Sequence, residues 1–427
     1  SEAAASRPAP RLWQQGAPPR PRAAGSSFPV KPCRVSLRPA REDDFVRICI
    51  PVVRDPGGAE ELLEGDEAAK LWLPRRGRER LRWRACGDSP CGWEFLPEEP
   101  SGPSPQLHFP IFVPSRQRAR EGYLDLTQAM RTDGPGFHRV GYQQIVVVRD
   151  CERREYWEVC TGDGQPLTLL SLPPVMDGMR IGAKRDVVLQ VAKQVCRRHR
   201  AFFMMDDSIK EWFGVLFPGD PAPVKGLSEG GTLPRFVSNI SLWDVLRPLQ
   251  DPRFADREKI LAVGFGRRRS GEPGVRILHA RRQVSSAVWF NLDEIERRKV
   301  GFSQHAVIWE DIDFFYKCAP HGSQDWQRHL YVTGENPGTP EGDAIVVKCN
   351  RYMMDKDSFL PGGCTDLAAV LPEEEAAGAV EGVRQMVASG LLSEEDAQYL
   401  SRYLPQSLRG AAVAGGAAEG RRGPDES

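Results

Sequence analysis

The stretch FFMMDDSIKEWF, Phe202 to Phe213, decides the fold because it joins a buried segment to two adjacent carboxylates. The apolar run Ala201–Met205 has the length of a buried strand, and it ends at Asp206 and Asp207. In open α/β sheets, ligands bind beyond the carboxyl ends of the strands. Two adjacent carboxylates repel each other unless a cation or a proton intervenes. The stretch therefore indicates either a site for Mg²⁺ or Mn²⁺, which prefer hard oxygen ligands, or a helix N-terminus capped by Asp207.

Composition limits the classes of partner. The 427 residues include 58 basic and 58 acidic side chains, so no net charge attracts nucleic acid or a membrane. Any nucleic-acid site must then be a local basic patch. Three basic runs could form one: 267–269, 281–282 and 297–299. Each run is also typical of a solvated protein surface. No apolar run approaches the ~18 residues of a membrane span.

The cysteines and the N-terminal segment indicate the compartment. Ten cysteines are scattered through a long chain, which is typical of reduced thiols in an intracellular protein. The first forty residues contain no apolar core of a signal peptide. We expect a location in the nucleus or cytoplasm and no association with a membrane.

Composition changes along the chain predict five segments. Residues 1–40 and 405–427 are rich in small residues, Pro and Arg, and we expect them to be disordered. Residues 41–106 form an accessory segment, either a small subdomain or strands added to the main sheet. Residues 107–371 form the main domain, and 372–404 form a helical hairpin whose second helix starts near Ser393.

The main domain alternates between strand and helix patterns. The predicted strands of its first half are FPIFVP (109–114), QIVVV (144–148), LTLLSL (167–172) and AFFMM (201–205). A helical stretch is expected around Gly122–Met130, and the apolar spacing from Lys184 to Arg198 predicts a second helix. This alternation predicts an α/β fold with a mainly parallel, Rossmann-like first half. The second half, with strands near 260–266, 285–292 and 344–349, is expected to be a mixed sheet.

Two basic clusters follow buried segments. Pro114 and Ser115 end a predicted strand, and Arg116 and Arg118 come directly after them. Guanidinium groups at such a turn suit the ribose and phosphates of a nucleotide, although an exposed basic loop has the same pattern. Lys184 and Arg185 lie in a first helical turn, where cations oppose the helix dipole. An anion bound at the helix start would offset that cost. The other interpretation is that Lys184 and Arg185 are ordinary exposed cations on the surface.

A third cluster combines acids with apolar residues. The segment WEDIDFF, Trp309 to Phe315, places Glu310 and Asp311 among aromatic and aliphatic side chains. An apolar environment raises the pKa of a carboxyl group, as a general base requires. The alternative is a helix that begins with acids on its solvated face.

The order of these features resembles that of glycosyltransferases with the GT-A fold. Among them, the chain most resembles the TET-associated, base-J-type glycosyltransferases, which are related to the C-terminal domain of the estrogen-induced growth-regulator family. The resemblance covers about residues 107 to 365 and rests on five segments: PIFVPSRQRAR (110–120), IGAKRDVVLQVA (181–192), FFMMDDSIKEWFG (202–214), FVSNISLWDVL (236–246) and WEDIDFF (309–315).

The resemblance implies a nucleotide-binding half, an acceptor half and a set of roles. Asp206 and Asp207 would hold Mn²⁺ or Mg²⁺, and Asp311 or Glu310 would be the catalytic base of an inverting hexosyl transfer. The nucleotide sugar, of the UDP-glucose or UDP-GlcNAc type, would contact six residues: Pro114, Ser115, Arg116, Arg118, Lys184 and Arg185. The implied acceptor is a hydroxymethylated DNA base, with protein Ser or Thr as the alternative.

Two other classes share the same residues. Many GT-A members have a third acid where this chain has Ser208, so a non-catalytic scaffold with this fold is one alternative. A metal-dependent phosphodiesterase or nuclease is another, although such sites normally use more carboxylates and a histidine. The sequence carries no signal for the oligomeric state.

Overall fold

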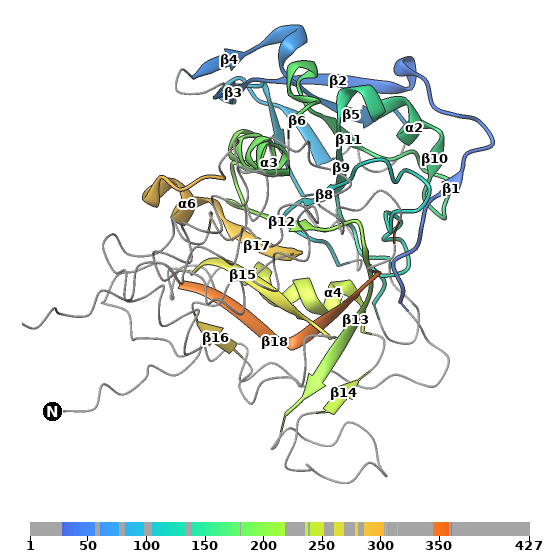
Figure 1. The fold of residues 1–427 in the computed structure, drawn as a ribbon, viewed down its shortest axis with the longest axis vertical. Coiled ribbons are helices and arrows are strands. Elements are labelled where there is room, and N and C mark those ends of the chain that lie inside the picture. The colour runs from blue at the N-terminus through green and yellow to red at the C-terminus, as the bar shows by residue number, and fades with distance from the viewer. Residues whose placement is uncertain are drawn as a thin grey trace, which may run out of the picture.

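The structure is a computed structural model of the 427-residue chain. It describes residues 28–55, 60–76, 82–97, 105–132, 139–179, 181–217, 235–237, 240–251, 260–268, 278–280, 286–302, 304, 314, 345–357 and 360. Figure 1 shows these parts in colour. Residues 1–27, residues 405–427, the Ser393 helix start and the segment from Trp309 to Asp313 lie outside the described residues. Residues 28–40 were also expected to be disordered, but they are ordered: Phe28 and Val30 are buried, and Arg34–Val35 pairs with Val159–Cys160. No helix within the described ranges is long and apolar enough to cross a membrane.

The described residues form one large mixed sheet of twelve strands. Along the sheet the order is β14-β13-β18-β15-β17-β12-β8-β9-β11-β5-β2, and β16 pairs with β18. These strands are β2 (Phe45–Ile50), β5 (Ala69–Pro74), β8 (Ile111–Pro114), β9 (Gln144–Val148), β11 (Leu169–Ser171), β12 (Ala201–Met205), β13 (Ile209–Leu216), β14 (Arg235–Val237), β15 (Ile260–Arg267), β16 (Leu278–Ala280), β17 (Ala287–Asn291) and β18 (Ile345–Lys356).

The centre of the sheet is parallel and its flanks are mixed. Strands β11, β9, β8 and β12 run parallel to one another, whereas β12 pairs with β17 antiparallel. Beyond β17 only the β15–β18 pair is parallel among the described strands. The predicted parallel first half is therefore confirmed for four strands, and the predicted mixed second half is also confirmed.

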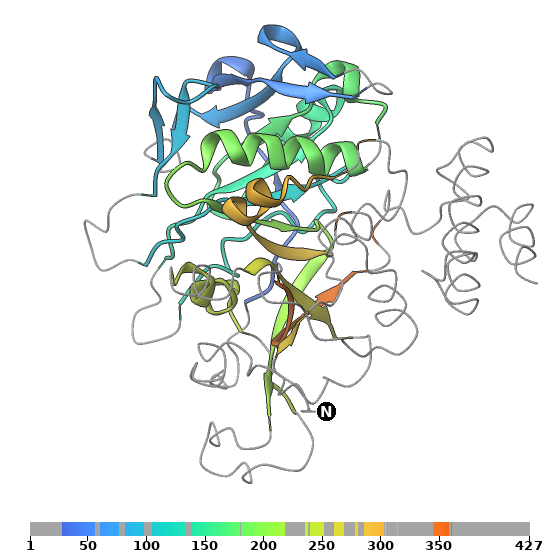
Figure 2. The ribbon, with the colours of Figure 1, turned by 90° about the vertical axis from the view of Figure 1, so that its left-hand side faces the viewer.

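Helices cover both faces of the sheet. The described helices of four or more residues are α2 (Arg153–Trp157), α3 (Ile181–Val195), α4 (Leu242–Leu246), η6 (Arg247–Gln250) and α6 (Leu292–Arg298). Helices α3 and α6 lie on one face and α2 and α4 on the other (Figures 1 and 2). The remaining short elements are β1 (Arg34–Val35), η1 (Glu42–Asp44), β3 (Val52–Arg54), β4 (Glu61–Leu63), η2 (Gly65–Glu67), β6 (Trp83–Ala85), β7 (Trp93–Phe95), η4 (Asp150–Glu152), β10 (Val159–Cys160) and η5 (Pro174–Met176).

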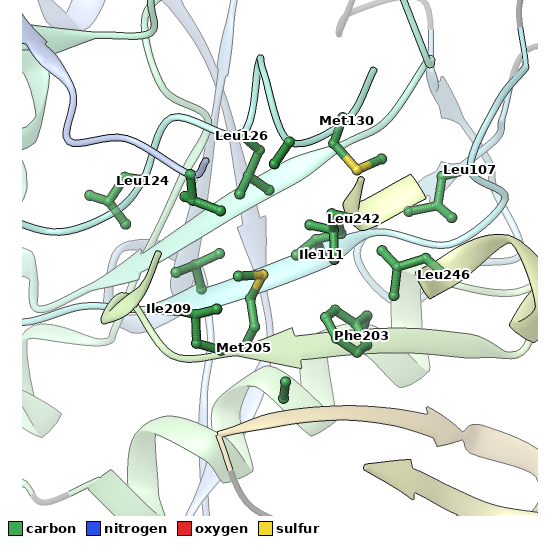
Figure 3. Close-up of a cluster of buried hydrophobic side chains, with 14 of the residues drawn as sticks. Leu107, Ile111, Leu124, Leu126, Met130, Phe203, Met205, Ile209, Leu242 and Leu246 are labelled. Atoms are coloured by element: carbon green, nitrogen blue, oxygen red, sulfur yellow. The ribbon is translucent and has the colours of Figure 1, made fainter. Parts of the chain in front are cut away.

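Alternating side chains divide the core into two layers. In β12, Phe203 and Met205 join the layer under α2 and α4, whereas Phe202 and Met204 join the layer under α3 and α6. This follows from the two-residue period of a strand. Figure 3 shows part of the first layer, where Phe203 packs near Ile111 and α4. Both faces of the central strands are buried, which explains their continuous apolar sequences.

The segment before residue 106 contributes to the same sheet. Strand β5 pairs antiparallel with β11, and β2 pairs antiparallel with β5. Two arrangements were expected for this segment, and the structure shows the second one, in which its strands extend the main sheet.

The structure also contradicts one local expectation and one alternative. Residues Gly122–Met130 form turns and an isolated bridge rather than a helix, because Asp125 instead accepts hydrogen bonds from the backbone of Thr127 and Gly162, which favours a turn. Asp207 does not cap a helix: the acidic pair lies in a turn between β12 and β13.

Candidate functional site

The carboxyl ends of three parallel strands meet at one edge of the sheet. Ser115 follows β8, η4 follows β9, and Asp206 follows β12. The first turn of α3, which comes after β11, lies beside them, since the Lys184 ammonium donates to the Ser115 carbonyl over 2.7 Å. Residues separated by about ninety positions are thus brought together at the edge where open α/β sheets bind ligands.

Asp207 is bound on both carboxylate oxygens. Arg118 donates to Oδ1 over 2.6 Å, and the Ser115 hydroxyl donates to Oδ2 over 2.7 Å. The Tyr156 hydroxyl in turn donates to Ser115 Oγ over 2.8 Å. The Asp207 side chain is only 7% exposed. Burial raises the pKa of Asp207 above its ordinary value, more than Arg118 and Ser115 lower it.

Asp206 has a different environment. Its Oδ2 forms an ion pair with the Lys356 ammonium, and its Oδ1 lies 3.8 Å from the Arg185 guanidinium. Its backbone N–H donates to the Ser286 carbonyl over 2.7 Å. Burial alone would raise the pKa of Asp206, but Lys356 and Arg185 outweigh burial and lower it to about 2. Asp206 is therefore a carboxylate at neutral pH.

Lys184 lies at the base of the site. Its side chain is buried, and burial lowers the pKa of Lys184 to about 8, although Glu152 and Asp207 favour its charged form. Glu152 is buried too and is paired with Arg149. The site thus contains a lysine that titrates near physiological pH.

Two residues other than glycine adopt left-handed backbone conformations beside the acidic pair. Gln117 has φ 53° and its N–H donates to Glu152 over 3.4 Å. Ser286 has φ 69°, and its hydroxyl accepts hydrogen bonds from Lys356 and Arg267, each over 3.0 Å. Such conformations are unfavourable for residues with a Cβ and tend to persist at binding sites, where the surrounding contacts hold them.

The structure brings together most of the residues that we selected from the sequence: Pro114, Ser115, Arg116, Arg118, Lys184, Arg185, Asp206 and Asp207. Arg120 points elsewhere and pairs with Glu158 over 2.8 Å. Glu310 and Asp311 lie outside the described residues, so the expected base stays a prediction.

Sequence reasoning missed several residues of the site: Arg149, Glu152, Tyr156, Ser286 and Lys356. It had named Arg267 only as part of a basic run, whereas Arg267 donates to Ser286. Lys356 is 150 positions from Asp206 along the chain. The sequence predicted that its strand would end at Cys349, before Lys356. No local pattern marks it, because only the pairing of β18 with β13 brings it to this edge.

The donor set does not fit a resident divalent cation in this arrangement. Every carboxylate oxygen of Asp206 and Asp207 already faces Lys356, Arg185, Arg118 or Ser115. Among the described residues, no group of three or more Asp, Glu, His or Cys side chains is placed to hold a metal. In this arrangement the expected Mg²⁺ or Mn²⁺ would have to displace one of these partners.

Comparison with known proteins adds little. No protein-family model and no curated protein matches the chain. Among solved structures, it is similar to residues 1–349 of TarS from S. aureus, with 10% identity and a TM-score of 0.32. The similarity covers 72% of this chain and 88% of that chain. A TM-score of this size does not establish a shared fold, so the similarity carries no functional argument.

Proposed function

We propose that this chain is a glycosyltransferase of the GT-A type that moves a hexose from a UDP-sugar to a hydroxyl acceptor. One observation supports the proposal most: the loop after β8, helix α3 and strand β18 each place cations around a carboxylate pair at the carboxyl edge of the parallel strands. A cluster of fixed cations at this edge suits a diphosphate. The sequence resemblance supplies the sugar and the transfer reaction.

The cations also suit the departure of the diphosphate. Arg116 Nε is buried and has no hydrogen-bond acceptor within the described part of the chain, so a phosphate oxygen would satisfy it. Lys184 and Arg185 are the fourth and fifth residues of α3, close to the helix start, where backbone N–H groups also favour an anion. Charge that develops on a leaving UDP would be stabilised by these preorganised groups.

The proposed transfer is an in-line displacement. The acceptor hydroxyl gives its proton to Asp311, or failing that to Glu310, as its oxygen bonds to the anomeric carbon. The bond from that carbon to the diphosphate oxygen breaks, and UDP leaves with the electron pair, with inversion at the carbon. General-base help is worth about 10²–10⁴ in rate.

The acceptor proposal is a hydroxymethylated DNA base, and a protein Ser or Thr hydroxyl is the other candidate. Arg268 lies over the rings of Phe213 and Phe236, 4.3 and 5.6 Å from their centroids. Phe236 is partly exposed, and an aromatic–arginine surface suits a single-stranded or flipped base. Arg297 and Arg298 instead pair with Glu294 of the same helix, so the charges of that basic run are balanced within α6.

The test combines binding and turnover. Purified chain is titrated with UDP, then incubated with UDP-glucose or UDP-GlcNAc and either a hydroxymethylcytosine oligonucleotide or a Ser/Thr peptide. We expect Asp311→Asn to retain UDP binding and to lose transfer by about 10²-fold or more. Lys210→Met, which removes a cation paired with Asp355 outside the site, is the matched control. Wild-type turnover in Asp311→Asn would refute the base assignment.

A second candidate is a non-catalytic scaffold with this fold. The observation that favours it is that Asp206 and Asp207 are neutralised by the protein's own cations, so the site is stable without a ligand. In that case no nucleoside diphosphate raises the melting temperature of the chain.

A further inference from the structure

Lys356 forms an ion pair with Asp206, one of the two acids that the sequence assigned to a metal. It is the last residue of β18, which pairs antiparallel with β13, and Lys356 lies opposite Ile209 in that ladder. Its ammonium therefore reaches back to Asp206 across the turn that joins β12 to β13. The Lys356 side chain is 16% exposed, so its charge is largely shielded from water.

The ammonium is held by two acceptors and keeps a third donor. Nζ donates to Asp206 Oδ2 and to Ser286 Oγ, the latter over 3.0 Å. Ser286 also accepts from Arg267 and adopts a left-handed conformation. An ammonium has three N–H donors. Two of them are used by Asp206 and Ser286 within the described residues, so the third can donate to a ligand.

The charges around the pair already perform what a divalent cation would do. Asp206 faces Lys356 and Arg185, and Asp207 faces Arg118, so three cations surround two carboxylates. A divalent cation placed between the two acids would have to displace Lys356 or Arg118. The Lys356 ammonium already supplies positive charge at this place, so a diphosphate can be neutralised without displacing Lys356 or Arg118.

We infer that Lys356 takes the place of the divalent cation, so that the site binds a nucleoside diphosphate through protein cations and without metal. The inference rests on the proposed function, because it identifies the group that neutralises the diphosphate of the same donor. Lys356 is a specificity-determining residue in this scheme: its free donor faces a phosphate oxygen, and Asp206 and Ser286 position it.

Calorimetric titration of the full chain with UDP tests this inference. The chain is dialysed against EDTA, and the titration is repeated with MnCl₂ and with MgCl₂. We expect the dissociation constants to agree within about twofold, because fixed cations do not depend on added metal. The EDTA measurement needs no variant, so it holds even where a substitution disturbs folding.

Three variants then assign the effect to Lys356. Lys356→Met should weaken UDP binding about tenfold or more, because a charge-assisted hydrogen bond is lost, and should leave the affinity for uridine unchanged. Lys356→Arg keeps the charge and should restore binding to within about threefold of wild type. Lys210→Met removes an equal charge from the neighbouring strand β13 and should bind UDP like wild type. A merely structural loss would lower the affinities for uridine and UDP together.

Two failures are distinguishable. UDP binding that requires Mn²⁺ or Mg²⁺, or a wild-type affinity in Lys356→Met, overturns the inference and leaves the proposed function standing. Absence of UDP binding in every buffer overturns the proposed function and the inference with it.

Discussion

At the scale of single residues, two adjacent aspartates have different properties because their partners differ. Asp206 pairs with Lys356 near the surface, whereas Asp207 is buried against Arg118 and Ser115. Their pKa values therefore move in opposite directions. Asp206 positions the Lys356 ammonium, and Asp207 holds the loop after β8 against the end of β12.

The Arg118–Asp207 pair should be important for stability. Arg118→Met leaves a buried carboxylate without its cation, which costs about 3 kcal/mol at neutral pH. The loss should shrink as the pH falls, because a protonated Asp207 needs no cation. Urea unfolding of Arg118→Met, Asp207→Asn and the double variant measures the coupling. If the two single losses simply add in the double variant, the pair does not act as a unit.

Lys184 predicts a specific dependence of stability on pH. Its pKa is about 8 in the folded chain, compared with 10.5 for an ordinary exposed lysine. Between these values the unfolded chain binds the extra proton, so the free energy of unfolding rises with pH. The gain between pH 8 and 10.5 is about 3 kcal/mol. Below pH 8 both states are protonated and the contribution does not change.

Lys184→Met isolates this contribution from that of other titrating groups. The difference in unfolding free energy, wild type minus variant, should increase from pH 7 to pH 10 in urea titrations. A difference that stays flat across this range would mean that Lys184 keeps an ordinary pKa. UDP affinity of the wild type should also fall across the same range, since neutral Lys184 no longer attracts a phosphate.

At the scale of elements, the ends of strands and helices carry the site and its supports. Asn291 ends β17 and caps α6: its Oδ1 accepts from the Asp293 N–H over 3.1 Å, and its Nδ2 donates to the Ile260 carbonyl over 3.1 Å. One side chain thus fixes the start of α6 against β15. Strand β17 begins directly after Ser286, which contacts Lys356.

Asn291→Ala should destabilise the chain by about 2 kcal/mol, because it removes a helix cap and leaves a buried carbonyl without a donor. Asn291→Ser keeps a cap acceptor and removes the amide donor, so about half of this loss should remain. Denaturant midpoints of the two variants against wild type give the comparison. Equal losses would show that the cap contributes nothing.

The sequence predicted the elements whose signal is local and missed those that depend on tertiary pairing. The β-branched runs in β8 and β9, the apolar run of β12 and the apolar spacing of α3 each predict an element from a few neighbouring residues. Turn chemistry was harder: Asp125 hydrogen-bonds nearby backbone and replaces an expected helix with turns.

The same distinction applies to the site. Ser115, Arg118 and Asp207 were predicted because each follows a strand of recognisable composition. Lys356 and Ser286 were missed because antiparallel pairing, which single-sequence patterns do not encode, brings them to the acidic pair. Single-sequence patterns therefore do not identify site residues, such as Lys356 and Ser286, that reach the site from strands distant in the sequence.

At the scale of the whole molecule, the sheet is continuous from β2 to β14, so the segment before residue 106 is a structural part of the site-bearing domain. Trp72 of β5 shows why: its indole N–H donates to Ser171 Oγ of β11 over 3.1 Å, and its ring meets Trp157 edge-on at 5.4 Å. The Trp72 side chain is fully buried.

A chain that begins at Gln106 should therefore fail to fold cooperatively. Removing β2 and β5 leaves β11 as an exposed edge with unpaired backbone groups, and it uncovers the apolar surface that β5 buries. We expect aggregation on size-exclusion chromatography and no sharp melting transition. A chain that begins at Phe28 keeps both strands and should melt like the full chain. If the fragment from Gln106 melted cooperatively and bound UDP, residues 41–106 would be a separable unit, and the edge of β11 would need no partner to be stable.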